Sequence, residues 1–245
     1  VIWPESAAGF DVSRGKALVE LHEVANLVDS DILFGSDIRE QGKDYNALYL
    51  VTGATFDFQR YEKRNLVPFG EYVPTLFRPL FGRKATAGDE DYSAGERPPV
   101  LTWRGRFLGV AICFESILPH HIATAVREGA QVLVVIANDI WLTPPAYTHH
   151  LRLTALRALE AGRDALFVSN GGYTALLSGG RAVEMVSAGQ APLRVEARLE
   201  SRVTPWVRWG VLLPLGFVVL VVAIRVAGYG VAYAYPPRST RLPMG

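Results

Sequence analysis

The sequence predicts an α/β domain with layered sheets, followed by one apolar helix long enough to cross a membrane. Between residues 31 and 169, apolar β-branched runs alternate with segments of helical periodicity. Hydrophobic residues make up 49% of the 245-residue chain, which is enough for one large domain with a sizeable core. The mean hydropathy of +0.16 is high for a soluble protein, and it indicates a membrane segment in addition.

Composition excludes several classes of protein. The formal net charge of +1 indicates no nucleic-acid partner. The single cysteine rules out an internal disulfide and a cysteine-rich zinc site. The histidine pairs His120-His121 and His149-His150 offer at most one metal ligand each, because neighbouring residues on a helix point about 100° apart. We therefore expect neither a metal nor a cofactor.

The first part of the chain is predicted to contain one amphipathic helix and several strands. The apolar run Val1-Ile2-Trp3 ends at Pro4 as if a strand were already under way, so we expect the chain to be incomplete at its N-terminus. Apolar residues at helical spacing predict a helix over 13–30. Strands are predicted in three further runs: 31–35, 47–53 and 55–61.

The second part of the chain is predicted to alternate strands with helices. Strands are predicted over 106–112, 131–137 and 165–169, and helices over 118–129 and 148–162. The first two of these strands are expected to be parallel neighbours, because a helix connects them. Residues 174–177 and 193–199 are expected to form an outer hairpin or edge pair.

Two apolar segments contain prolines that interrupt regular structure. Residues 66–74 hold two prolines and a glycine, so the backbone is stiff and fixes Glu71 at a set distance from Lys63. The second segment covers residues 140–147. Residues 76–84 alternate apolar with basic side chains, which suits either an anionic membrane surface or a loop packed on its own domain.

The C-terminal segment has the features of a membrane span. An uncharged apolar run over 210–224 lies between two tryptophans and three tyrosines, which is typical of the two membrane interfaces. Two arginines after it place the C-terminus in the cytoplasm and the α/β domain outside it. A core helix is the alternative. The chain is thus divided into an α/β domain, a transmembrane helix and a tail: 1–203, 206–231 and 232–245.

Polar side chains stand at the ends of the predicted strands: Glu5, Lys63, Glu71, Cys113, Glu115, Asn138 and Asn170. A carboxylate, an ammonium and a thiol can together transfer an acyl group. The carboxylate takes the thiol proton, and the ammonium stabilises the thiolate and then the tetrahedral oxyanion. The alternatives are that Cys113 is a small buried residue at a strand end and that Glu5 is a solvated loop carboxylate.

Four motifs resemble the nitrilase superfamily and, more narrowly, the apolipoprotein N-acyltransferase family. They are Trp-Pro-Glu at 3–5, Lys63 before Leu-Val-Pro-Phe-Gly-Glu-Tyr-Val-Pro at 66–74, Ile-Cys-Phe-Glu at 112–115 and Asn-Asp-Ile-Trp at 138–141. Residues 157–163 and 204–210 also match, so the resemblance extends from residue 1 to about residue 217. It implies a nitrilase-like αββα sandwich, here without its first strand and helix, a multi-helix membrane domain upstream and a final transmembrane helix.

The resemblance also implies a two-step reaction with a Glu-Lys-Cys triad. Glu5 would be the general base, Lys63 would stabilise the oxyanion, and Cys113 would carry the acyl group as a thioester. Four residues would support the site: Glu71, which orients Lys63, and Glu115, Phe114 and Asn138. Phe114 departs from the family, which often has tyrosine there, so a hydroxyl role at that position is lost.

The implied substrates belong to a membrane. The donor would be a phospholipid, and the acceptor would be the N-terminal amine of the diacylglyceryl cysteine of an apolipoprotein. The implied location is the bacterial inner membrane, with the catalytic domain on the periplasmic side and the segments at 72–82 and 140–147 as a lipid-facing mouth. One alternative is a nitrilase-type amidase that hydrolyses a small C–N substrate with the same triad. Another is an inactive, membrane-anchored fragment.

Overall fold

The computed structural model describes residues 1–7, 12, 15–55, 57–81, 91–187, 189–210 and 212–234. The chain divides into two units, Val1–Thr204 and Pro205–Gly245. The first unit contains both sheets and is the subject of the site analysis. The second contains the short helix α5 (Pro205–Trp209) and the helix α6 (Leu212–Ala234).

A three-stranded antiparallel sheet is built from β1 (Ile32–Glu40), β2 (Lys43–Thr52) and β3 (Asp57–Glu62), in that order. The three strands predicted here are confirmed, and β1 and β2 extend to within two residues of each other. Both residues of the connecting turn, Gln41 and Gly42, have positive φ values of 51° and 76°. This conformation matches the right-handed twist of a tight hairpin.

A six-stranded mixed sheet follows, in the order β4-β5-β6-β7-β8-β9. Its strands are β4 (Val100–Trp103), β5 (Arg106–Ile112), β6 (Val132–Ala137), β7 (Ala165–Ser169), β8 (Tyr173–Ser178) and β9 (Arg181–Ser187). The predicted parallel pairing of 106–112 with 131–137 is confirmed, with Ile112 opposite Ile136. The predicted hairpin partner at 193–199 is wrong. The chain reverses at Gly179 and Gly180, both of which have positive φ, so β8 pairs with the strand that follows directly, β9.

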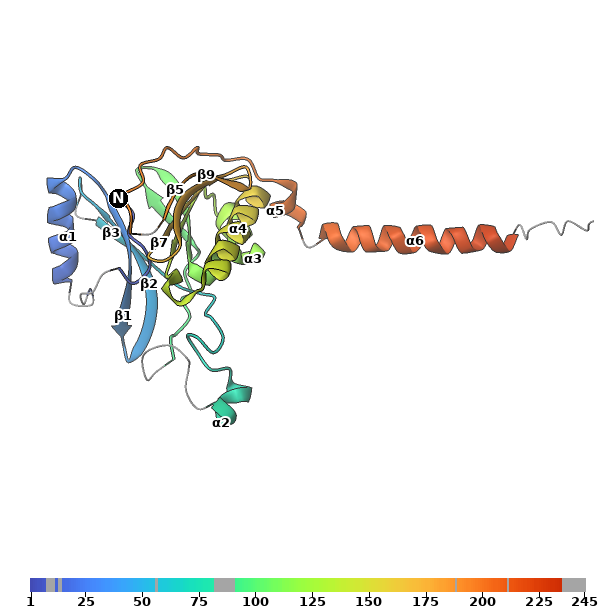
Figure 1. Cartoon of the computed structure of the whole chain (residues 1–245), viewed down its shortest axis with the longest axis horizontal. Coiled ribbons are helices and arrows are strands. Elements are labelled where there is room, and N and C mark those ends of the chain that lie inside the picture. The colour runs from blue at the N-terminus through green and yellow to red at the C-terminus, as the bar shows by residue number, and fades with distance from the viewer. Residues whose placement is uncertain are drawn as a thin grey trace, which may run out of the picture. The chain divides into compact units, whose positions relative to one another are not determined.

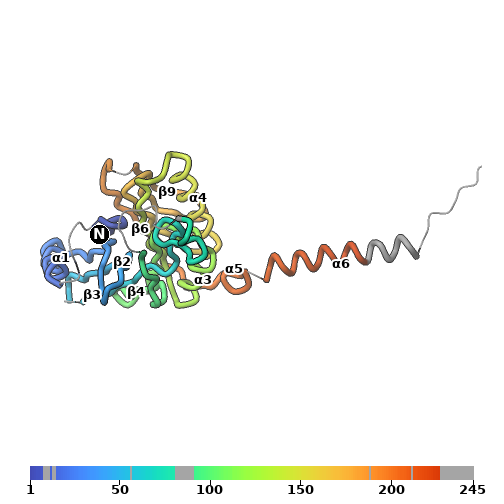
Figure 2. Tube along the Cα trace, turned by 90° about the horizontal axis from the view of Figure 1, so that it is seen from below, coloured from blue at the N-terminus to red at the C-terminus, as the bar shows by residue number. Residues whose placement is uncertain are grey.

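The two sheets pack face to face between helical layers. Side chains from both sheets form one core, including Leu48 and Leu50 of β2 and Val110 and Val134 of the larger sheet. The alternate residues of β2 face the other way, toward α1 (Lys16–Leu27), so β2 is buried on both faces. Figures 1 and 2 show α1 on one side of the sheets and the helices α3 (Pro119–Arg127) and α4 (Pro144–Ala161) on the other. The predicted αββα sandwich is therefore confirmed.

The other described helices of the first unit are short: η1 (Thr75–Phe77), α2 (Arg78–Phe81), η2 (Cys113–Ile117) and η3 (Asp139–Trp141). The helix predicted over 148–162 begins earlier, so part of the segment 140–147 is helical. Pro144 and Pro145 occupy the first turn of α4, where a helix needs no N–H donor.

The transmembrane helix predicted over 206–231 is not supported. Within the described part of the chain, no helix combines the length and the apolar character that a membrane crossing requires. Of the tail predicted over 232–245, residues 235–245 lie outside the described residues.

Gly35 of β1 permits the chain around Glu5 to lie directly against the sheet. A Cβ added at Gly35 would lie 2.7 Å from Glu5 Cα and 2.8 Å from Ile136 Cδ1. We therefore expect Gly35→Ala to lower the free energy of unfolding by about 1–3 kcal/mol, measured by denaturant titration. The control is Gly216→Ala, since nothing lies within 4 Å of a Cβ added there. Equal stability of Gly35→Ala and wild type would contradict the close packing.

Candidate active site

Cys113 lies at the turn that follows β5. It is the first residue of η2, and its φ of +51° is rare for a residue other than glycine. β5 and β6 are parallel, so Cys113 and Asn138 leave the sheet at the same edge. Cys113 is partly buried, and its side chain lines a cavity. The fold thus presents the only thiol of the chain at the carboxyl ends of the parallel strands, where open α/β sheets build their sites.

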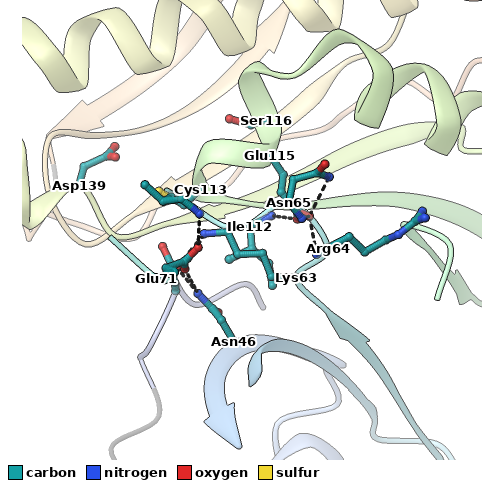
Figure 3. A network of polar contacts seen from close by, with 12 residues as sticks. Asn46, Lys63, Arg64, Asn65, Glu71, Ile112, Cys113, Glu115, Ser116 and Asp139 are labelled. Atoms are coloured by element: carbon teal, nitrogen blue, oxygen red, sulfur yellow. Dashed lines mark hydrogen bonds and ion pairs between the residues drawn. The ribbon is translucent and has the colours of Figure 1, made fainter. Parts of the chain in front are cut away.

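A buried charge cluster lies in the same cavity. Lys63 Nζ donates to Glu71 Oε1 at 2.9 Å and lies 3.9 Å from Glu5 Oε1. Asn46 of β2 links the two carboxylates, with Nδ2 2.6 Å from Glu5 Oε1 and 3.2 Å from Glu71 Oε1. Only 1% of Lys63 and 5% of Glu5 are exposed. Figure 3 shows Asn46, Lys63 and Glu71 pointing toward one another beside Cys113.

The predicted loop at 66–74 holds Glu71 in this cluster. Glu71 Oε2 accepts a hydrogen bond of 2.8 Å from the backbone N–H of Val67, so the loop binds its own carboxylate. The other oxygen of Glu71 is thereby directed toward Lys63. The expectation that Glu71 lies at a set distance from Lys63 agrees with these contacts.

The cluster shifts the pKa values of its members. Burial raises the pKa of Glu5, while the charge of Lys63 and the Asn46 hydrogen bond lower it in part. Burial alone would lower the pKa of Lys63, but the neighbouring Glu5, Cys113 and Glu71 raise it above the ordinary value. Burial and the charge of Glu5 raise the pKa of Cys113 to about 12, against the opposing effect of Lys63. The resting site therefore has an ammonium, a protonated thiol and a carboxyl group of increased basicity.

Glu115 lies behind the cavity and joins the two sheets. It is fully buried, and its oxygens accept hydrogen bonds from four groups at 2.8–3.0 Å: Tyr61 OH and the backbone N–H groups of Arg64, Asn65 and Ile112. Arg64 and Asn65 directly follow Lys63, and Ile112 directly precedes Cys113. One carboxylate thus holds the chain around the ammonium against the chain around the thiol (Figure 3).

A second network lies beside Cys113. His150 of α4 has Nδ1 2.8 Å from Asp139 Oδ1, and its Nε2 lies 2.9 Å from Ser116 Oγ and 3.2 Å from the Cys113 carbonyl oxygen. Ser116 Oγ lies 2.8 Å from Thr154 Oγ1. Candidate ligand atoms of Cys113, Asp139 and His150 lie within 4.8 Å of one another. Both ring nitrogens of His150 have hydrogen-bond partners within the protein.

The cavity has a volume of about 930 Å³ and two kinds of lining. Its polar part includes Glu5, Asn46, Lys63, Glu71 and Cys113. Its apolar part includes Phe114, Ile117, Trp141, Leu142, Pro145 and Leu153. A cavity of this kind can hold an apolar chain while presenting a polar group to the thiol.

The structure brings most of the predicted site residues together. Six of them line the same cavity: Glu5, Lys63, Glu71, Cys113, Phe114 and Asn138. Glu115 lies behind it, and Asn170, considered only as a residue at a strand end, does not line it. The backbone N–H of Asn138 contributes a hydrogen bond that lowers the pKa of both Glu5 and Cys113.

Sequence reasoning missed Asn46, Asp139 and His150. Asn46 had a usable signal, since it is a polar residue at the start of a buried apolar run in β2. In the sequence, His150 stands out only as one of two adjacent histidines, and Asp139 only as the neighbour of Asn138. Nothing in their spacing shows that the two meet beside Cys113.

Fold and site together define an α/β protein with a cysteine, a lysine and carboxylates in one cavity. The chain belongs to the carbon-nitrogen hydrolase family, which it matches over residues 4–202. The amidase from Nesterenkonia sp. AN1, of the nitrilase superfamily, has a similar structure, with a TM-score of 0.57 and 18% identity. The match covers 76% of this chain and 72% of the amidase. At this identity the likeness concerns the fold alone.

Three relatives named apolipoprotein N-acyltransferase confirm the narrower resemblance. The protein from Geobacter metallireducens is 34% identical over 212 residues, covering 83% of this chain and 39% of the relative. The Pseudomonas aeruginosa protein is 31% identical, with 86% and 43% covered. The Aquifex aeolicus protein is 30% identical, with 73% and 40% covered. The chain therefore spans about two fifths of the length of these curated relatives.

Glu115 is expected to be essential for the stability of the site. In Glu115→Gln, the amide group would direct a donor at backbone N–H groups that now donate to a carboxylate. The free energy of unfolding should fall by about 1–3 kcal/mol, measured by denaturant titration. The same exchange at the exposed Glu96 is the control and should have no effect. Unchanged stability of Glu115→Gln would show that these hydrogen bonds do not join the sheets.

Proposed function

We propose that this chain forms the catalytic part of an acyltransferase. It moves a fatty acyl chain from a phospholipid, through a thioester on Cys113, to the N-terminal amine of the diacylglyceryl cysteine of an apolipoprotein. The observation that best supports this proposal is that Glu5, Lys63 and Cys113 line one cavity with an extended apolar wall. The similarity to proteins named apolipoprotein N-acyltransferase supports the choice of donor and acceptor.

In the first half-reaction, the phospholipid ester enters with its acyl chain against the apolar wall. Glu5 takes the proton of the Cys113 thiol, and the thiolate attacks the ester carbonyl carbon. The ammonium of Lys63, held by Glu71 at 2.9 Å, stabilises the negative oxygen of the tetrahedral intermediate. Glu5 then returns the proton to the departing alcohol oxygen. The products are a lysophospholipid and a thioester on Cys113.

The second half-reaction uses the same groups. The acceptor amine attacks the thioester carbon, and Glu5 takes a proton from the attacking nitrogen. Lys63 again stabilises the oxyanion, and the C–S bond breaks as the amide forms. Glu5 returns the proton to the sulfur, which restores the resting site. The thiol pKa of about 12 makes a base necessary, since little thiolate exists at neutral pH without one.

Exposed apolar side chains support a lipid substrate and a location at the bacterial inner membrane, on its periplasmic side. Leu76 and Leu80 are about four-fifths exposed, and Ile140 and Trp141 are 68% exposed. These residues belong to the two segments proposed as a lipid-facing mouth, 72–82 and 140–147, of which residue 82 lies outside the described residues. Trp141 also lines the cavity, so an apolar surface is continuous with the site.

Hydrolysis of a small C–N bond is the competing function. The same triad can form a thioester and pass it to water, and the fold resembles that of an amidase. The apolar cavity wall favours acyl transfer, because a small amide needs no such surface. An inactive fragment is less well supported, since the chain retains all three reacting groups in one cavity.

Incubation of the chain with phospholipid vesicles should give one acyl adduct. Intact mass measurement is expected to show an increase of one acyl group, which hydroxylamine removes because a thioester is labile to it. Cys113→Ala should show no adduct. An adduct that persists in Cys113→Ala would overturn the thioester mechanism. Release of ammonia from small amides, with no adduct from phospholipid, would establish the amidase function instead.

Lys63→Ala should abolish turnover while Cys113 remains in place. Without the ammonium, nothing offsets the charge of the oxyanion, and Glu5 and Glu71 face each other across the site. We expect the rate of adduct formation to fall by about 10²–10³-fold or more, measured by time-resolved intact mass. The control is Lys43→Ala, at an exposed position on β2. A normal rate in Lys63→Ala would remove Lys63 from the mechanism.

A further inference from the structure

The pair formed by Asp139 and His150 lies against the nucleophile and has no role in the mechanism above. His150 lines the cavity, and Asp139 is 1% exposed. The imidazole contacts the carbonyl oxygen of Cys113 itself, at 3.2 Å from Nε2. This contact holds the peptide group that follows the positive φ of Cys113. The imidazole ring therefore helps to hold the backbone conformation that orients the Cys113 thiol.

The hydrogen bonds of His150 require particular protons. A carbonyl oxygen only accepts, so the contact with Cys113 requires a proton on Nε2. The contact of Nδ1 with Asp139 Oδ1, at 2.8 Å, also requires a proton between the two atoms. When both hydrogen bonds form to a carboxylate and a carbonyl, the ring has a proton on each nitrogen and a positive charge.

Two buried hydroxyl groups adapt to either form of the ring. Ser116 Oγ can donate to Nε2 of a neutral imidazole, or it can accept from Nε2 and donate to Thr154 Oγ1. Ser116 is 0% exposed and Thr154 is 1% exposed. Ser116 and Thr154 keep a hydrogen-bond partner in either arrangement, whereas the Cys113 carbonyl oxygen accepts from the ring only when Nε2 carries a proton.

Asp139 by itself opposes formation of the thiolate. Its charge raises the pKa of Cys113, in addition to burial and the charge of Glu5. Asp139 Oδ2 is buried without a hydrogen-bond partner among the described residues. A positive charge on His150, whose ring nitrogen lies within 4.8 Å of the sulfur and of Asp139, offsets that carboxylate.

We propose that His150, oriented by Asp139, is a positioning residue that fixes the Cys113 carbonyl and neutralises the effect of Asp139 on the thiolate. This role rests on the proposed function of Cys113 as a nucleophile. The ring of His150 is also packed edge-on against Phe167 of β7, with centroids 5.2 Å apart. Three charged groups act on the Cys113 sulfur: Asp139 of η3, Glu5 and Lys63. His149, the neighbour of His150, also lines the cavity.

Alkylation of Cys113 by iodoacetamide tests this proposal without any acyl substrate. The chain has one cysteine, so intact mass reports its modification directly. Measured from pH 7 to pH 9, alkylation of His150→Gln should be about tenfold slower than that of wild type, with its pH profile moved to higher pH by about one unit. His22→Gln is the matched control, since His22 also contacts a backbone carbonyl oxygen but lies on α1. It should leave the profile unchanged.

A double variant separates an electrostatic role from simple packing. In His150→Gln/Asp139→Asn, the carboxylate that opposes the thiolate is gone, so alkylation should be at least about threefold faster than in His150→Gln. The part of the wild-type rate that is not recovered reports the lost contact with the Cys113 carbonyl oxygen. A double variant as slow as His150→Gln, or an unchanged profile in His150→Gln, would overturn the proposal. These outcomes leave the acyl-transfer proposal standing, because that proposal is tested by the phospholipid adduct.

Discussion

The structure of the site depends on one buried ammonium. Lys63 is 1% exposed and has carboxylates on two sides, Glu71 at 2.9 Å and Glu5 at 3.9 Å. Removal of one partner from such a group generally costs about 3–5 kcal/mol, because a charge remains buried without compensation. The protein therefore has to hold both carboxylates in place. It does so with Asn46 of β2 and with the loop that follows Lys63.

The packing of two sheets brings this charge cluster to the thiol. Lys63 follows β3 of the first sheet, whereas Cys113 follows β5 of the second. The side chains between the sheets set their separation, and Glu115 binds backbone groups on both sides. The geometry of the site therefore depends on the same contacts that stabilise the sandwich. The positive φ of Cys113 is maintained at this junction.

The cavity combines two environments that a lipid-directed acyl transfer needs. Its charged side can move a proton and stabilise an oxyanion, and its apolar side can accept a chain and exclude water. The networks around Glu5 and His150 approach Cys113 from different elements, the chain before β1 and helix α4. Under the proposed mechanism, Cys113 thus has a base, a cation and a support for its carbonyl group.

The periodicity of the sequence predicts an α/β domain with layered sheets and two parallel strands, because periodicity is a local property of the chain. The resemblance of its motifs predicts the αββα order and the candidate residues Glu5, Lys63 and Cys113, which the structure places in one cavity. The sequence does not predict that Asn46 contacts Glu71, because the two residues lie 25 positions apart. It also does not predict that Asp139 and His150 meet beside Cys113, because the path of the chain between them is not readable from the residues. It also misplaced the partner of β8 and the start of α4. Tertiary packing decides which strands pair and which side chains meet in the cavity, because both depend on contacts between residues that are distant in the sequence.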